Sequence, residues 1–82
     1  MKIYYMNTYT LAEVKKHNTL KDAWMIYNTS VYDITKFIKL HPGSLSIKKG
    51  IGKDATQIIN KVGHSDRALK IMNKYKVGSL HS

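Results

Sequence analysis

The sequence predicts an α+β domain, in which a small β-sheet is combined with a helical hairpin. The compact apolar run 23–27 and the run 30–33 are separated by the turn-prone pair Asn28-Thr29, which predicts a β-hairpin. Apolar residues at helical spacing form two stripes of equal length, in the segments 55–62 and 68–75. Because a tight turn joins these stripes, we expect two helices that fold back on each other.

Two short strands near the ends of the chain and one short helix are the other elements expected beside the hairpin. We expect an edge strand over residues 3–6 and a short final strand over residues 76–80. Thr10 and Glu13 have the capping-box pattern, with a hydroxyl at the cap and a carboxylate three residues later. A short helix should therefore follow Thr10 and end near His17.

The middle of the chain predicts short helices separated by turns. Residues 34–40 are expected to form one or two helical turns that stop at His41-Pro42-Gly43, because proline restricts the preceding residue and glycine permits a left-handed turn. The segment 44–53 predicts a loop around a short helix. Asp54 and Ser65 are the expected caps of the two hairpin helices, whose stripe ends with Ile71, Met72 and Tyr75.

Composition narrows the class of protein. With 82 residues, 43% of them hydrophobic and 23% charged, the chain suits one globular domain, which we expect to span residues 1–82. The absence of cysteine excludes disulfides, thiolate metal sites and covalent haem attachment through cysteine. No apolar run approaches the roughly 20 residues of a transmembrane helix, and the N-terminus lacks the apolar core of a signal peptide. The net charge of +9 points to acidic partners: nucleic acid, anionic lipid or an acidic protein.

Six motifs occur in the order and near the spacing found in the cytochrome b5 family. They are Tyr9-Thr10-Leu11-Ala12-Glu13-Val14, Trp24-Met25-Ile26, Val31-Tyr32-Asp33-Ile34-Thr35-Lys36-Phe37, His41-Pro42-Gly43, Asp54-Ala55-Thr56 and Val62-Gly63-His64-Ser65. His-Pro-Gly alone is a weak signal, but the combination of all six is specific. The chain therefore resembles the cytochrome b5 family from about Tyr5 to Leu80.

This resemblance implies a cytochrome b5-like fold, with a small mixed β-sheet and two helical hairpins that form a haem pocket. The implied cofactor is a noncovalent haem b with His41 and His64 as axial ligands to the iron. Two imidazoles leave no open position for oxygen or substrate, so the expected role is a soluble electron carrier that cycles between ferric and ferrous states rather than an enzyme. The resemblance further implies that the carbonyls of Gly43 and Ile59 accept the second ring proton of His41 and His64.

The implied pocket is apolar, and each of its residues could equally be ordinary core packing. Its walls would be formed by Phe37, Ile34, Ile47, Ile58, Ile59, Val62, Ala68 and Ile71, with Tyr27 at the floor. Ser65 matches a position that contacts a haem propionate in the family, besides its expected role as a helix cap. His17 and His81 have no partner at ligand spacing, and we expect neither to bind iron.

The charge of the chain departs from the family pattern. Familiar members surround the exposed haem edge with carboxylates, whereas the segment from Lys36 to Lys61 contains six lysines and one carboxylate, Asp54. We therefore expect redox partners with an acidic docking surface: a reductase as donor, and an oxidase, desaturase-type enzyme or monooxygenase as acceptor. A solvated lysine-rich surface that reflects compositional bias is the alternative. The segment after His41-Pro42-Gly43 also differs, which leaves Leu45 and Ile47 uncertain as pocket members.

Two other classes of function compete with the electron carrier. A basic nucleic-acid-binding module would explain the charge, but the lysines are scattered and no zinc knuckle or RNA-recognition motif is present, so we expect no nucleic-acid partner. A haem-binding regulatory or ligand-binding relative of the same fold would usually lack the two axial histidines, which this chain has. We expect a cytoplasmic, soluble monomer without a transmembrane segment.

Overall fold

The sheet is mixed and five-stranded. The computed structural model describes residues 7–40, 45–62 and 66–81, and for residues 45, 46, 62 and 66–69 it describes the backbone alone. The strands are β1 (Thr8–Tyr9), β2 (Asn18–Thr19), β3 (Asp22–Tyr27), β4 (Ser30–Asp33) and β5 (Lys76–Leu80). They are ordered β1-β5-β4-β3-β2, with β1 and β5 parallel and every other neighbouring pair antiparallel. The predicted α+β class with a small mixed sheet is confirmed.

The predicted β-hairpin is the centre of this sheet. β3 and β4 pair antiparallel, with Trp24 opposite Asp33 and Tyr27 opposite Ser30. The two turn residues between them have positive φ angles, 48° at Asn28 and 63° at Thr29, which is the twist that a two-residue hairpin turn requires. The Asn28 amide donates a hydrogen bond of 3.0 Å to the Thr56 hydroxyl, so the turn is held by the helix that follows Asp54.

Five short helices accompany the sheet. They are α1 (Leu11–Lys15), α2 (Thr35–Leu40), α3 (Leu45–Lys48), α4 (Thr56–Val62) and α5 (Asp66–Asn73). The predicted capping box is present at α1, where the Glu13 amide donates to the Thr10 hydroxyl at 3.1 Å and the Thr10 amide donates to the Glu13 carboxylate at 3.3 Å. Asp54 accepts from the Thr56 amide at 3.0 Å and from the Thr56 hydroxyl at 2.6 Å, directly before α4, whose first helical hydrogen bond is accepted by Ala55.

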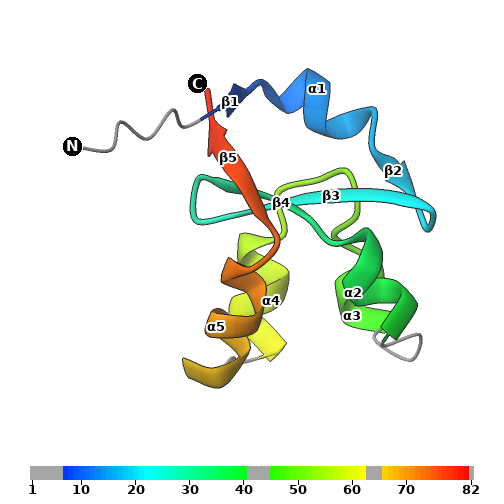
Figure 1. Cartoon of the computed structure of the whole chain (residues 1–82), viewed down its shortest axis with the longest axis vertical. Coiled ribbons are helices and arrows are strands. Elements are labelled where there is room, and N and C mark those ends of the chain that lie inside the picture. The colour runs from blue at the N-terminus through cyan, green and yellow to red at the C-terminus, as the bar shows by residue number, and fades with distance from the viewer. Residues whose placement is uncertain (1–6, 41–44, 63–65, 82) are drawn as a thin grey trace.

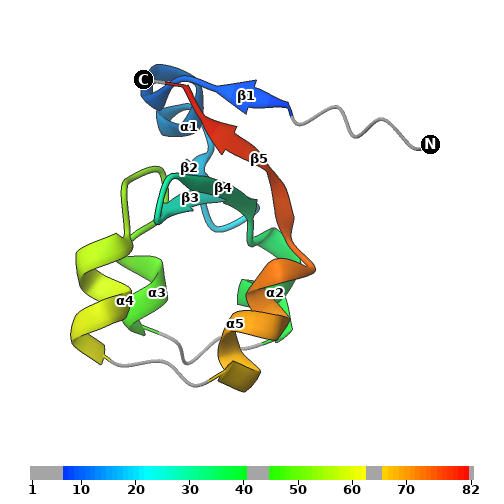
Figure 2. The same cartoon turned by 90° about the vertical axis from the view of Figure 1, so that its left-hand side faces the viewer.

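The helices lie on one side of the sheet, apart from α1. Figures 1 and 2 show α2, α3, α4 and α5 extending from one face, whereas α1 lies beside β1 at the other end of the molecule. Side chains alternate along β3, so Ala23, Met25 and Tyr27 join the core cluster under α2–α5. Ile26 joins Val14 and Val31 in a second cluster on the opposite face. The sheet therefore separates two apolar clusters.

Two strands were not among the predicted elements. β1 and β2 have two residues each, too few to show an alternating pattern, and tertiary pairing alone defines them. β1 can pair with β5 because Gly78 has no side chain, and a Cβ there would meet the Asn7 carbonyl. The edge strand expected over residues 3–6 lies outside the described residues, as does the expected cap Ser65.

Candidate functional site

The two segments that carry the predicted metal ligands connect helices on one face of the sheet. His41 directly follows the last residue of α2, and His64 lies in the short connection between α4 and α5. Both histidines, together with Gly43 and Ser65, lie outside the described residues. The ends of α2 and α4 that lead to them lie on the side of the molecule away from the sheet (Figures 1 and 2).

Three of the predicted pocket residues are buried in the core beneath the sheet. Ile34, Ile59 and Tyr27 expose only 1%, 5% and 6% of their surface. The Tyr27 hydroxyl donates a hydrogen bond of 3.1 Å to the side-chain carbonyl of Asn60 on α4, so its polar end is satisfied. These residues therefore belong to the buried core between the sheet and the four helices.

Four further predicted pocket residues are only half-buried, and each comes from a different helix. Phe37 lies on α2, Ile47 on α3, Ile58 on α4 and Ile71 on α5. Phe37 and Ile47 pack against the buried cluster beneath the sheet. Val62 and Ala68 belong to α4 and α5, but their side chains are outside the described part of the structure.

Two residues of the same apolar surface were not assigned to the pocket from the sequence. Met72 and Tyr75 are half-buried and pack against the same core cluster as Phe37 and Ile47. The rings of Phe37 and Tyr75 meet edge-on, with centroids 6.1 Å apart and planes at 72°. The signal was available, since Met72 and Tyr75 continue the helical stripe through Ile71, but the pattern does not distinguish a core residue from a cofactor contact.

The chemistry of this surface suits an apolar ligand. Among the described residues, no buried side-chain nitrogen or oxygen lacks a hydrogen-bond partner, and the core contains no buried polar or charged residue. The described residues also hold no group of three or more histidine, cysteine, aspartate or glutamate side chains that could bind a metal ion by themselves. A porphyrin fits such walls, because its macrocycle is apolar and its iron needs only two further ligands.

His17 has a packing role on the opposite face of the sheet. Its ring stacks on Trp24, with centroids 3.8 Å apart and an interplanar angle of 8°, and Trp24 in turn meets Tyr9 edge-on at 4.8 Å. The Nδ1 atom of His17 lies 2.8 Å from an Asp22 carboxylate oxygen. The aromatic stack and the carboxylate together occupy this histidine.

The exposed ends of α2 and α4 are basic. Lys39 near the end of α2 and Lys61 near the end of α4 are exposed, and Leu40, the last residue of α2, is 70% exposed. None of the described helices has both the length and the apolar character needed to cross a membrane.

Comparison with known proteins gives a consistent result. Residues 10–81 match the family described as cytochrome b5-like heme/steroid binding domain. A cytochrome b5 of Drosophila melanogaster is 47% identical over 74 residues, which are 89% of this chain and 55% of that protein. An NADH nitrate reductase of Cucurbita maxima is 49% identical over 75 residues, which are 90% of this chain and 8% of the enzyme. The chain thus spans about half the length of the cytochrome b5 relatives that it matches.

Solved structures agree with the sequence matches. The structure of cytochrome b558 from Ectothiorhodospira vacuolata, described as a prokaryotic homologue of cytochrome b5, superposes with a TM-score of 0.83. The two sequences are 28% identical, and the superposition covers 93% of this chain and all of that one. The arrangement of sheet and helices is therefore that of a cytochrome b5 homologue.

Proposed function

The chain belongs to the cytochrome b5 family, and from this premise we propose that it is an electron carrier with a noncovalent haem b held by His41 and His64. The observation that carries the proposal is the half-buried apolar surface on the helical side of the sheet, together with two histidines that follow α2 and α4 in the chain. The family name covers both haem and steroid binding. Histidines at both positions favour haem, because a steroid needs no metal ligand.

The proposed ligand set defines what the protein can do. When bound, haem supplies an iron that exchanges one electron between its ferric and ferrous states. With His41 and His64 both as ligands, the iron would have no open position for oxygen or a substrate, which favours a carrier over a catalyst. The similar segment of a nitrate reductase fits this role, because there it is a small part of a larger enzyme.

The residues of this chain would hold the group in three ways. Phe37, Ile58 and Ile71 would cover its apolar faces and exclude water. The backbone carbonyls of Gly43 and Ile59 would accept the second ring proton of His41 and His64 and so orient the imidazoles. Ser65 would bind a propionate. Met72 and Tyr75 extend the same apolar wall, because they pack against the same core cluster as Phe37.

The proposed partners are redox proteins with acidic docking surfaces. A reductase would supply the electron, and an oxidase, a desaturase-type enzyme or a monooxygenase would accept it. Exposed lysines on α2 and α4 support this choice, because rim charges mainly set the encounter rate and the partner. We further propose that residues 1–82 act as a single domain, monomeric and located in the cytoplasm.

The visible absorption spectrum tests the proposed function directly. We expect the purified chain to bind added haemin, to show a sharp Soret band, and to develop split α and β bands when dithionite reduces the iron by one electron. A chain that stays colourless after addition of haemin would contradict the proposal.

Substitution of the histidines tests the ligand assignment. We expect His41→Ala and His64→Ala to lose haem or to bind carbon monoxide in the ferrous state, because one axial position is vacated. The matched control is His17→Ala, which removes a histidine from the aromatic stack on the opposite face and should leave the spectrum unchanged. Carbon monoxide binding by the control alone would exclude the assignment.

A further inference from the structure

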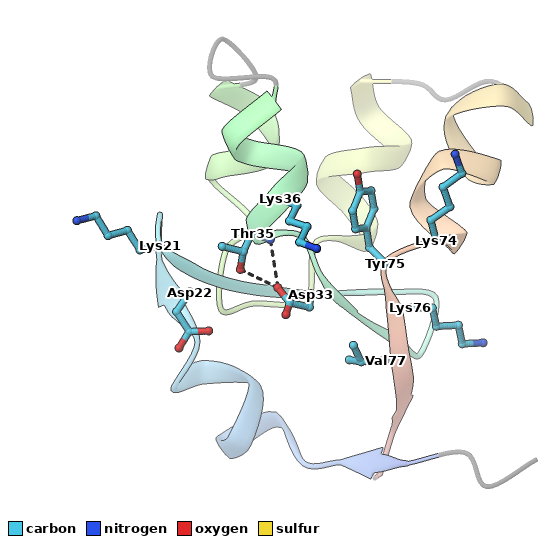
Figure 3. Close-up of a pocket in the computed structure, with 9 residues that line it drawn as sticks. All are labelled: Lys21, Asp22, Asp33, Thr35, Lys36, Lys74, Tyr75, Lys76 and Val77. Carbon is cyan, nitrogen blue, oxygen red and sulfur yellow. Dashed lines mark hydrogen bonds between the residues drawn. The ribbon is translucent and has the colours of Figure 1, made fainter.

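A basic groove lies between the end of the sheet and the helices α2 and α5. Figure 3 shows it at the points where β4 leads into α2 and where α5 leads into β5. Its volume is about 480 Å³. The residues that line it are Lys21, Asp22, Asp33, Thr35, Lys36, Lys74, Tyr75, Lys76 and Val77. Four of these nine residues are lysines, and all four are exposed.

The two carboxylates of the groove are already engaged within the chain. Asp33 accepts hydrogen bonds from the amide of Thr35 at 3.2 Å and from its hydroxyl at 2.7 Å. An Asp22 carboxylate oxygen lies 2.8 Å from the Nδ1 atom of His17, a residue that does not line the groove. Within the described part of the chain, no ion pair joins either carboxylate to a groove lysine. The four ammonium groups are therefore available to a partner.

The arrangement of the lysines fits an extended acidic surface better than a small anion. A phosphate or sulfate ion needs donors that converge on one point. In Figure 3, Lys21 and Lys76 extend away from the groove in opposite directions, and Lys36 points across it towards Tyr75. Charges spread in this way can meet several carboxylates of a protein surface at once, and Tyr75 and Val77 supply a half-buried apolar strip between them.

The groove is also in contact with the proposed haem pocket. Tyr75 lines the groove and meets the ring of Phe37 edge-on at 6.1 Å, and Phe37 is one of the predicted wall residues. The Tyr75 carbonyl accepts a hydrogen bond of 2.9 Å from the Asp33 amide, which holds this residue at the end of the sheet. Tyr75 therefore links the groove to a wall residue of the proposed pocket.

We infer that this groove is a docking site for the acidic surface of a protein partner, a second basic face besides the exposed ends of α2 and α4. The choice of a redox protein as the partner rests on the proposed function. The binding itself depends on the groove lysines and can be measured without any electron transfer. Lys74 and Lys76 are then specificity-determining residues that belong to the groove and not to the ends of α2 and α4.

Binding of polyglutamate to the full chain loaded with haem tests the groove. In 20 mM salt, titration calorimetry should show binding, and NMR should show the largest amide shifts at Tyr75 and Val77. The variant Lys36→Glu/Lys74→Glu/Lys76→Glu should bind about tenfold more weakly, since three favourable surface pairs become repulsive. The control Lys15→Glu/Lys16→Glu/Lys53→Glu has the same net charge as the groove variant. It should bind polyglutamate at least about threefold more tightly than the groove variant does.

The outcomes separate this inference from its alternatives. Equal weakening in both triple variants, or wild-type amide shifts centred away from Tyr75, would show a diffuse response to net charge and overturn the groove. Stronger dependence on the groove lysines for phosphatidylserine vesicles or for duplex DNA than for polyglutamate would assign it to a membrane or to nucleic acid instead. A chain that fails to bind haemin but keeps the groove-dependent binding would contradict the proposed function and leave the docking site intact.

Discussion

The two faces of the sheet differ in the elements that cover their apolar clusters. On the face beside α1, Val14, Ile26 and Val31 have no exposed surface, and Trp24 and Tyr9 pack around them. On the other face, half-buried apolar side chains of α2, α3 and α5 pack against the buried cluster. Half-buried apolar side chains surround both clusters, but those around the first belong to paired strands, whereas those around the second come mainly from short helices.

The difference between the faces follows from the length of their elements. The helices α2, α3, α4 and α5 contain six, four, seven and eight residues. Isolated helices shorter than about 12 residues are marginal in water, so helices of this length depend on tertiary packing. The first face is held instead by paired strands and a fully buried cluster. A large apolar cofactor would supply the packing that the helical face lacks.

Removal of haem should have the largest effect, and the effect should be confined to the helical face. A ligand that binds the native state alone stabilises it by about 4 kcal/mol at a concentration 1,000 times its dissociation constant. In the apoprotein we expect loss of hydrogen-exchange protection across residues 37–75, while amides of β3 around Trp24 remain protected. Uniform protection in the apoprotein would show that the two faces are one cooperative unit.

Truncation of one isoleucine on each face should separate the two kinds of packing. Ile26→Ala removes a side chain with no exposed surface and should destabilise the apoprotein and the haem-bound protein alike, by about 3 kcal/mol. The half-buried Ile58 is the matched position on the helical face. Ile58→Ala should lower the free energy of unfolding mainly in the haem-bound protein. Urea unfolding of both forms measures the two effects, and equal losses for Ile58→Ala in both forms would contradict the comparison.

The capping box of α1 should have the smallest effect. Thr10→Ala removes the hydroxyl that accepts from the Glu13 amide and should cost about 1 kcal/mol of stability. Because α1 lies at the end of the molecule away from the other helices, haem affinity should stay unchanged (Figure 1). Thr10→Ser restores the acceptor and serves as the control in thermal unfolding. A fall in haem affinity for Thr10→Ala would show that the first face controls the second.

Most elements could be predicted because they depend on local chemistry. The cap at Thr10, the turn at Asn28-Thr29 and the apolar stripes of α4 and α5 each follow from neighbouring residues, and each is present in the structure where its residues are described. The same patterns, together with the six motifs, were enough to indicate the family and a haem-binding role. The histidine ligands remain a prediction, since both lie outside the described residues.

Other features depend on residues far apart in the chain, and only the tertiary structure determines them. β1 has two residues and exists because β5 passes beside it at Gly78, some 70 residues later in the sequence. Likewise, no local sequence pattern predicts that Phe37 contacts Tyr75. Nor does any local pattern predict that Lys36, Lys74 and Lys76 line one groove. Sequence alone determined the local elements, the family and the excess of positive charge. The fold decided where that charge gathers, because the position of a side chain on the surface is set by which distant strands and helices pack together.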